Sequence, residues 1–386
     1  MIATARLFLS ALTLAVPGVI ALPNANAGGA VARGRVTLPA VKLEMKSLGL
    51  GRRDASSSAN QTFVDVGSNW YITIKIGTPP QTFLLLGDSG APSLLVESTL
   101  EPPTAAPVVN IARYDPTASS TSKLKDGYTY QECYPGYCSS GVVFTDVLRI
   151  GDIVFSDFDF LAMTNNTRPT TEGPRSGNLG LNIDDGGMQT SPTRVPTLMQ
   201  RLVPQLENKL WTVDFHVSTQ TGQFDFGYID ESKYTGNIGW APVVSTGGLY
   251  QVEIRGVGAG YDDASIGATD FKVVVDTGSG GGTISRNIAQ NYWNHVPNAK
   301  WDDGWDNFIF PCGQALPDFV IQLADGNRVG IPGSALPDHC TDGWGNTMLA
   351  IGSDDDTLWG SNWIERYFII FDHGNKRVGF AQKSSQ

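Results

Sequence analysis

The stretch Leu84–Ser98, LLLGDSGAPSLLVES, places one acidic residue, Asp88, between two apolar runs. A carboxylate in such surroundings is costly to bury unless it is hydrogen-bonded, shared or neutralised. Asp, Ser and Gly are also ordinary turn residues, so the triplet alone is compatible with a simple turn between two strands. A related stretch in the second half of the chain decides between these interpretations.

That stretch is Val273–Gly281, VVVDTGSGG, in which an apolar run again leads into Asp, a small hydroxyl residue and Gly. The repeat favours a duplicated domain in which each half delivers one carboxylate to a shared interface. Most of the chain from Asn69 onward alternates apolar and polar residues with period two, which predicts strands. We expect an all-β fold with a few short helices, the best candidates lying near Thr197 and Arg286.

Two carboxylates held close together cannot both ionise cheaply, so they share one proton and titrate as a coupled pair. The ionised member can take a proton from a water held between them, while the protonated member donates to a peptide carbonyl oxygen. This chemistry needs neither a nucleophilic side chain nor a metal. We therefore expect Asp88 and Asp276 to be catalytic and their loops to be supported by the following residues: Ser89, Gly90, Thr277 and Gly278.

The N-terminal part has the composition of a leader. An apolar run at 7–22 is too short to span a membrane and predicts a signal peptide at 1–27, cleaved after Ala21 or Ala27. Residues 28–53 carry six basic residues and one acidic residue and end in the pair Arg52 and Arg53. This pattern predicts a propeptide with a dibasic processing site, although a flexible basic linker stays possible. We expect a secreted product without a membrane anchor.

The rest of the chain is strongly acidic. Residues 1–53 hold 7 of the 27 basic and 1 of the 38 acidic residues, so positions 54–386 carry 20 basic against 37 acidic residues, a formal charge of −17. This acidic part of the chain, here called the body, is a poor candidate for binding nucleic acid. The basic leader and the acidic body have opposite charges, which favours electrostatic docking of the leader on the body.

Four cysteines in a secreted chain should form two disulfides. Of the three possible connectivities, proximity favours the local one, Cys133 with Cys138 and Cys312 with Cys340. The four histidines have no ligand-like spacing, so we expect no metal and no cofactor. The sequons at Asn60 and Asn165 are consistent with glycosylation.

Taken together, the sequence resembles the pepsin-like aspartic endopeptidases over about Asn69–Ala381. The resemblance rests on these segments: WYITIKIGTPPQTFLLLGDSG, YDPTASSTSK, FGYIDESKYTGNIGWAPV and LWGSNWIERYFIIFDHGNKRVGFA. It implies a fungal-type zymogen with a bilobal fold, in which two related β-barrel-like lobes at 54–236 and 237–386 flank the active-site cleft. It also implies a monomer that acts on proteins or peptides.

The resemblance extends to the leader and to the second cysteine pair. RVTLPAVKLEMKSLG is similar to the family's inhibitory prosegment, which implies that a basic residue, Lys42 or Lys46, covers the two aspartates until maturation. The propeptide would then be an intramolecular inhibitor. Cys312 and Cys340 fit the disulfide of the family's C-terminal lobe.

The family also has a β-hairpin flap over the cleft, with a tyrosine that closes on substrate. Counting back from Ser139 puts Tyr134 in that position, with Tyr130 as the alternative. Pro135 and Gly136 suit the centre of a type II turn, so Tyr134–Tyr137 would form the tip. A disulfide between Cys133 and Cys138 would make the flap more rigid. The alternative is that the segment is a surface loop whose disulfide only adds stability.

Several residues near the two motifs depart from the family pattern. Ala91 stands where a Ser or Thr usually donates to the first carboxylate, so we expect a pH optimum nearer neutral. The other departures are Pro92 and Leu95, the run Gly280–Gly282, Asn178 and Ser361.

These departures keep a second hypothesis open, a pepsin-fold binding or inhibitor protein that has lost turnover. The retained aspartates and the apparent self-inhibiting leader favour an active secreted endopeptidase. A small dimeric protease of the retroviral type is excluded, because both motifs lie in one chain.

Overall fold

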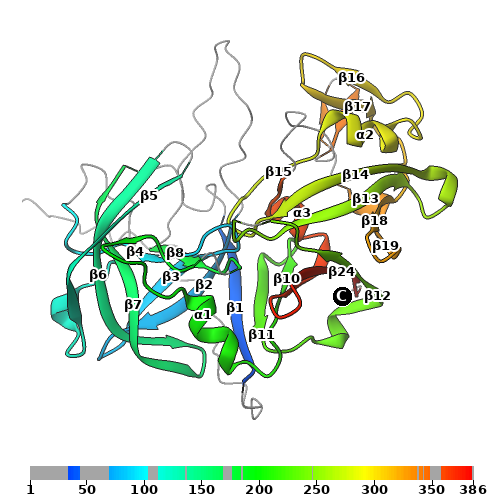
Figure 1. The fold of residues 1–386 in the computed structure, drawn as a ribbon. Coiled ribbons are helices and arrows are strands. Elements are labelled where there is room, and N and C mark those ends of the chain that lie inside the picture. Colours follow the sequence, from blue (N-terminus) through cyan, green and yellow to red (C-terminus); the bar gives the residue numbers. More distant parts are fainter. Residues whose placement is uncertain are drawn as a thin grey trace, which may run out of the picture. The chain divides into compact units, whose positions relative to one another are not determined.

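The chain folds almost entirely into β-strands, which form three sheets within the described residues (Figure 1). The computed structural model describes residues 34–43, 69–102, 112–134, 137–167, 176–183, 186–245, 247–336, 339–341, 343–347 and 358–384. The predicted signal peptide at 1–27, the processing pair Arg52 and Arg53, Lys46 and the sequon residue Asn60 lie outside these ranges.

The largest sheet has 14 strands in the order β12-β24-β23-β10-β11-β1-β2-β3-β8-β4-β7-β6-β5-β9. Its strands are β1 (Val36–Leu43), β2 (Asn69–Ile76), β3 (Gln81–Asp88), β4 (Leu94–Val96), β5 (Lys123–Tyr134), β6 (Tyr137–Ile150), β7 (Ile153–Asn166), β8 (Gly177–Gly180), β9 (Thr190–Ser191), β10 (Trp211–His216), β11 (Thr221–Phe226), β12 (Tyr234–Pro242), β23 (Tyr367–Asp372) and β24 (Arg377–Lys383). The last two strands of the chain thus share a sheet with strands from its first half.

Two smaller sheets come from the second half. The six-stranded sheet contains β13 (Gln251–Ala259), β14 (Ile266–Val275), β15 (Gly282–Thr283), β18 (Phe319–Leu323), β19 (Arg328–Ile331) and β22 (Leu358–Trp359). The four-stranded sheet contains β16 (Lys300–Asp302), β17 (Asn307–Pro311), β20 (His339–Thr341) and β21 (Trp344–Asn346).

The helices are short, as the sequence predicts. They are α1 (Leu198–Leu202), α2 (Arg286–Trp293) and α3 (Ser361–Ile364). Thr197 caps α1 in a capping box with Gln200, which satisfies backbone groups that the first turn leaves unpaired. No helix in the described ranges is long and apolar enough to cross a membrane.

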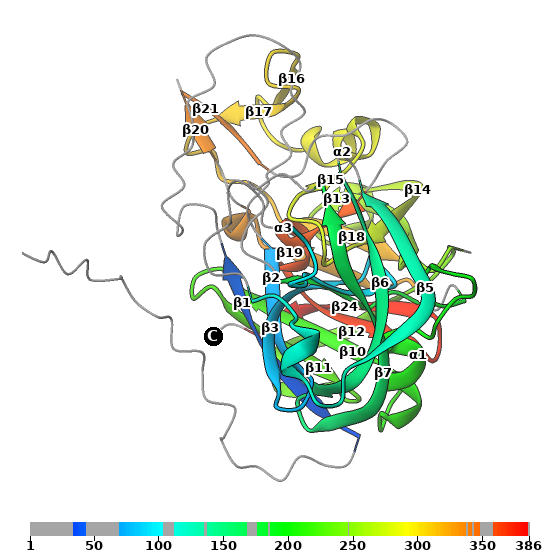
Figure 2. The same ribbon diagram turned by 90° about the vertical axis from the view of Figure 1, so that its left-hand side faces the viewer.

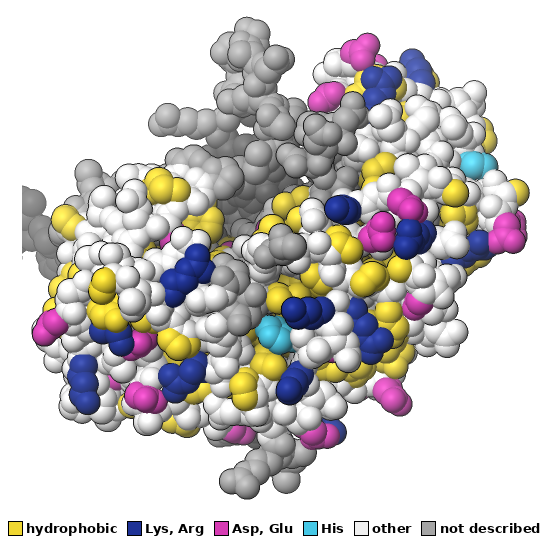
Figure 3. All heavy atoms as spheres, viewed as in Figure 1, with side chains coloured by type: hydrophobic (Ala, Val, Ile, Leu, Met, Phe, Trp, Pro, Cys, Tyr) yellow, Lys and Arg dark blue, Asp and Glu magenta, His cyan; other side chains and the backbone are white. Residues whose placement is uncertain are grey.

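The strand that carries Asp88 is formed by simple alternation. β2 pairs antiparallel with β3, and Ile74 lies opposite Phe83. Ile72, Ile74 and Leu85 are all buried in the main core, because alternate side chains of each strand point to the same face. Acidic and basic side chains are interspersed on the face seen in Figure 3, so the acidic excess forms no single patch there.

The described part of the predicted propeptide is a central strand of the large sheet. β1 pairs antiparallel with β2 on one side and with β11 on the other (Figures 1 and 2). Val36, Leu38 and Ala40 are buried beneath it. The leader therefore contributes apolar side chains to the same core as the rest of the chain.

Polar contacts also hold β1 to the body. The Lys42 ammonium lies 2.8 Å from Glu365 Oε1, and the indole of Trp70 donates to the same oxygen at 2.8 Å. The strand register sets this contact, since Lys42 lies opposite Trp70. Lys42 is thus paired with Glu365, and not with Asp88 or Asp276 as the family resemblance implied for it or Lys46.

Replacing Lys42 should destabilise the full-length chain. The Lys42 and Glu365 side chains are 6% and 2% exposed, so Lys42→Met leaves a buried carboxylate without its cation. We expect a loss of about 3 kcal/mol in the free energy of unfolding, measured by urea denaturation. Adding Glu365→Gln, which removes the charge but keeps an acceptor for the Trp70 indole, should recover most of the loss.

The matched control is Arg35→Met, which breaks a solvent-exposed ion pair with Glu207 at the other end of β1. Exposed pairs contribute little, so the midpoint of unfolding should hardly move. Equal losses for Lys42→Met and Arg35→Met would contradict the role given to burial.

Candidate active site

The two motif aspartates occupy matching positions in the two halves. Asp88 is the last residue of β3, and Asp276 directly follows β14. The N–H of Gly90 donates to Asp88 Oδ1 at 2.9 Å, and the N–H of Gly278 donates to Asp276 Oδ1 at 2.9 Å. Each loop therefore folds back on its own carboxylate in the same way.

The hydroxyl residues of the two motifs bind each other's loops. The N–H of Ser89 donates to Thr277 Oγ1 and the N–H of Thr277 donates to Ser89 Oγ, both at 2.9 Å. Ser89 Oγ in turn donates to the Val275 carbonyl at 2.9 Å, and Thr277 Oγ1 donates to the Gly87 carbonyl at 2.7 Å. Ser89 and Thr277 are fully buried, so these reciprocal bonds fix the two loops together without water.

The motif glycines pack against the opposite carboxylates. A Cβ atom at Gly90 would lie 2.7 Å from Asp276 Oδ1, and one at Gly278 would collide with the Asp88 carboxylate. A side chain at either position would push the two acids apart. Glycine is thus required by close approach, and this approach brings Asp88 and Asp276 together.

The surroundings favour a shared proton. Burial raises the pKa of Asp276, while the N–H groups of Gly278 and Gly90 and a hydrogen bond with Asp88 oppose the shift. Asp88 is only 6% exposed. Two buried carboxyl groups in hydrogen-bond contact titrate as a pair that shares one proton.

This geometry agrees with the comparison with known proteins. Residues 69–383 match the eukaryotic aspartyl protease family. The chain belongs to this family. It is a pepsin-like, aspartic-type endopeptidase, and its two motif aspartates lie inside the matched range.

Individual relatives cover most of this protease. It is 30% identical to podosporapepsin from Podospora anserina over 341 residues, which span 86% of this chain and 78% of the relative. It is also 30% identical to endothiapepsin from Cryphonectria parasitica over 344 residues, which span 87% and 80%. The crystal structure of an aspartic proteinase from Irpex lacteus superposes with a TM-score of 0.66 at 20% identity, covering 92% of this chain and 98% of that one, which shows the bilobal fold.

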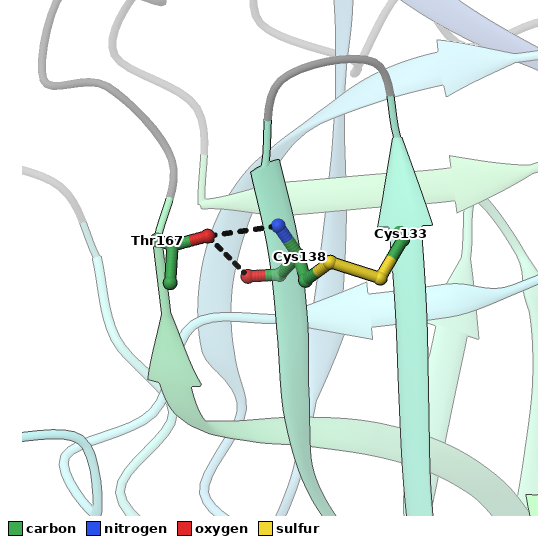
Figure 4. The surroundings of a disulfide bond; sticks show 3 residues. All are labelled: Cys133, Cys138 and Thr167. Carbon is green, nitrogen blue, oxygen red and sulfur yellow. Dashed lines mark hydrogen bonds between the residues drawn. A yellow bond between two sulfur atoms is a disulfide. The ribbon is translucent and has the colours of Figure 1, made fainter.

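In the protease, β5 and β6 form the hairpin predicted as the flap. Cys133 and Cys138 are cross-strand partners joined by a disulfide (Figure 4). The Thr167 side chain accepts the Cys138 N–H at 2.8 Å and donates to the Cys138 carbonyl at 3.1 Å. The hairpin is thus held by its own disulfide and by the end of β7. The turn residues Pro135 and Gly136 lie outside the described ranges.

Tyr134 and Tyr130 have different surroundings. Burial raises the pKa of Tyr134, and the negative charges of Glu132 and Asp88 raise it further. Its hydroxyl donates to Glu132 Oε2 at 3.1 Å, and its ring stacks on Tyr137. Tyr130 is instead part of the main core. Of the two, Tyr134 is the tyrosine whose electrostatic surroundings include Asp88, and it stays the predicted flap tyrosine.

The flap and the first catalytic loop are directly connected. Ser93, five residues after Asp88, donates its hydroxyl to Glu132 Oε1 on β5. Glu132 thus receives one bond from the loop and one from Tyr134. Sequence reasoning missed this residue, because nothing in the local pattern around Glu132 indicates its partner on another strand.

The remaining predicted residues have clear positions. Cys312, just after β17, is bonded to Cys340 on β20, so both local cysteine pairings are present. Asn165 is exposed on β7, where a glycan could be attached. The glycines after the second motif give room to tryptophan, since a Cβ atom at Gly282 would collide with the buried Trp363.

Asn178 is a second residue whose role the sequence did not reveal. Its side-chain amide donates to Asp88 Oδ2 at 3.1 Å. The only sequence signal was that an amide stands at a position beside the first catalytic loop where the family pattern differs. The contact itself depends on the pairing of β8 with β3.

Thr277→Val should weaken the joint between the loops. Valine keeps the shape but removes the donor to the Gly87 carbonyl and the acceptor for the Ser89 N–H. Two buried backbone groups lose their partners, so we expect a loss of about 3 kcal/mol in the free energy of unfolding, measured by denaturant titration.

Thr212→Val is the matched control. Thr212 is equally buried, but its hydroxyl has no hydrogen-bond partner within the part of the chain that the structure describes. This variant should unfold at the wild-type midpoint or above it. A loss as large as that of Thr277→Val would show that hydroxyl removal is costly at any buried threonine.

Proposed function

We propose that this chain is a secreted, active endopeptidase that hydrolyses internal peptide bonds with a water activated between Asp88 and Asp276. The observation that carries the proposal is the meeting of these two carboxylates at the ends of buried strands, fixed by the reciprocal bonds of Ser89 and Thr277. A structural turn would need neither the second carboxylate nor the close glycine approach.

In the proposed reaction, ionised Asp88 takes a proton from the water, and the water oxygen bonds to the peptide carbonyl carbon. Asp276 donates its proton to the carbonyl oxygen, which gives a neutral tetrahedral diol. Asp88 then passes its proton to the amide nitrogen and the carbon–nitrogen bond breaks. A diol proton returns to Asp276, so the pair ends in its starting state.

The flap would hold the substrate against this pair. Tyr134 lies near Asp88, and its contact with Glu132 connects it to the loop that follows Asp88. A disulfide at Cys133 and Cys138 limits how far the hairpin tip can open. We infer that the flap positions extended peptides with little freedom of its own.

The leader is proposed to keep the protease inactive until it is cut at Arg52 and Arg53. β1 supports this role, because residues 36–43 are built into the sheet of the body. Lys46 stays the candidate for covering the aspartates, since Lys42 is bound to Glu365. Secretion through the signal peptide, glycosylation at Asn60 and Asn165, and a monomeric state complete the proposal.

The alternative, a pepsin-fold binding or inhibitor protein, is favoured by one observation. Ala91 lacks the hydroxyl that family members use beside the first aspartate, and its side chain is buried. The two hypotheses differ in one measurable property, which is turnover of peptides after the leader is removed.

Asp276→Asn should abolish turnover. The amide can neither hold the shared proton nor donate it to the carbonyl, so we expect at least about a 10³-fold loss of kcat/KM. The measurement is cleavage of a mixed peptide library at acidic pH after leader removal. Asp270→Asn, on the strand that precedes Asp276, is the control, because Asp270 is exposed and pairs with Arg255. Absence of cleavage by the wild type would instead favour the binding protein.

Tyr134→Ala should lower kcat/KM by about 10²-fold without a change in the unfolding midpoint, because misplaced substrate reacts slowly. Tyr130→Phe is the control, since it keeps the aromatic ring that packs in the core. Unchanged turnover in Tyr134→Ala, measured on the same peptides, would remove this tyrosine from the site and leave the hairpin a stabilising role.

A further inference from the structure

We propose that Asn178 is a positioning residue for Asp88, whose side-chain amide supplies the hydrogen bond that a hydroxyl at position 91 would otherwise donate. The inference rests on the proposed function, in which Asp88 is the ionised member of the pair. It concerns a residue of β8 that lies 90 positions from Asp88 in the chain.

The sheet directs this side chain to the carboxylate. β8 runs parallel to β3, with Asn178 opposite Leu86 and Gly180 opposite Asp88. Side chains two residues apart on a strand share a face, so the amide points along the strand toward the acid. Asn178 is 4% exposed, and its Nδ2 lies 3.1 Å from Asp88 Oδ2.

Asp88 therefore accepts bonds at both oxygens. The Gly90 N–H donates to Oδ1 at 2.9 Å, and the Asn178 amide donates to Oδ2. Both donors stabilise the ionised carboxylate more than the neutral acid, because a hydrogen bond to a charged acceptor is the stronger one. A buried amide without such an acceptor would be costly, so the contact also accounts for a polar residue in a buried strand.

The second half of the chain has the opposite arrangement. β22 runs parallel to β14, and Leu358 lies opposite Val274, two residues before Asp276, just as Asn178 lies opposite Leu86. The half with Ala91 after its motif thus has an amide on the neighbouring strand, whereas the half with Ser279 has a leucine there. The Ser279 hydroxyl lies 3.5 Å from the Gly281 carbonyl.

This difference makes the two aspartates unequal. Asp88 has a side-chain donor from the neighbouring strand, while the matching position beside Asp276 is apolar. Within the described residues, the titratable groups seen to interact with Asp88 include Asp276 from the second half and Tyr134 from β5, and Tyr134 in turn contacts Glu132. All three are acids, so none of them stabilises the ionised form of Asp88. The side-chain amide of Asn178 does stabilise it, and it therefore favours the negative charge on Asp88 and the proton on Asp276.

The consequence concerns activity at low pH. The loss of the hydroxyl at Ala91 alone would move the acidic limb of the pH profile upward, toward a neutral optimum. With Asn178 in place, Asp88 keeps its donor and stays ionised at lower pH. We infer that the acidic limb of the pH profile of this protease lies at the same pH as in a family member that has a hydroxyl residue at the position of Ala91.

The test is the pH profile of kcat/KM for four matured proteins: wild type, Asn178→Leu, Ala91→Ser and the double variant. Leucine is the residue that the second half has at the matching position. Asn178→Leu should move the acidic limb up by about one pH unit, equal to a tenfold loss of kcat/KM on the acidic side. Ala91→Ser should restore the limb in the double variant and change it little alone. Asn178→Ala, which removes the same donor, replaces Asn178→Leu should that variant not fold.

Asn182→Ala is the matched control. Asn182 is a buried amide just after β8, and its Oδ1 has no hydrogen-bond partner in the described ranges. Its removal should leave the limb in place. The proposal is overturned by an unmoved limb in Asn178→Leu, by an equal shift in Asn182→Ala, or by a double variant that Ala91→Ser does not restore.

A second readout does not depend on turnover. Carbon NMR of protein labelled at the aspartate carboxyls follows the titration of the pair directly, and its lower step should rise in Asn178→Leu by the same amount as the acidic limb. A wild type that cleaves nothing would overturn the proposed function alone, because the NMR shift still tests Asn178. Active wild type with an unmoved lower step would overturn the role of Asn178 alone.

Discussion

The site depends on the reciprocal hydrogen bonds between Ser89 and Thr277. Each hydroxyl accepts the other's backbone N–H and donates to a carbonyl on the partner's strand. Neither loop can satisfy these buried groups by itself, so each half is complete only when the other is docked on it. The same contact holds together the two loops that carry the carboxylates.

Much of this could be predicted from the sequence, because it is encoded locally. The apolar runs that end in DSG and DTG predicted two buried acids at strand ends, and the alternation around them predicted the sheets. Proximity in the chain was enough to pair Cys133 with Cys138. Each of these inferences needed only a short window of residues and the geometry of a strand or hairpin.

The contacts that escaped prediction are set by strand pairing between distant segments. Lys42 has Glu365 as its partner because β1 lies beside β2 in one particular register, and a shift of one residue would turn the ammonium to the other face. Asn178 reaches Asp88 only because β8 is parallel to β3. Likewise, the departure from the family pattern at Gly280–Gly282 did not indicate that Trp363 fills the space beside Gly282. These partners cannot be predicted from the residues on either side of each position in the sequence.

The position of β1 has a further consequence for the proposed maturation. Because this strand has neighbours on both sides, the proposed cut at Arg52 and Arg53 would break none of the ladder hydrogen bonds that hold residues 36–43. Pulling the strand out would leave β2 and β11 as two facing open edges, separated by about 10 Å at normal strand spacing. Open edges invite pairing with other chains. In the proposed maturation, proteolysis and release of the leader would thus be separate events, and release would require another strand to pair with β2 and β11.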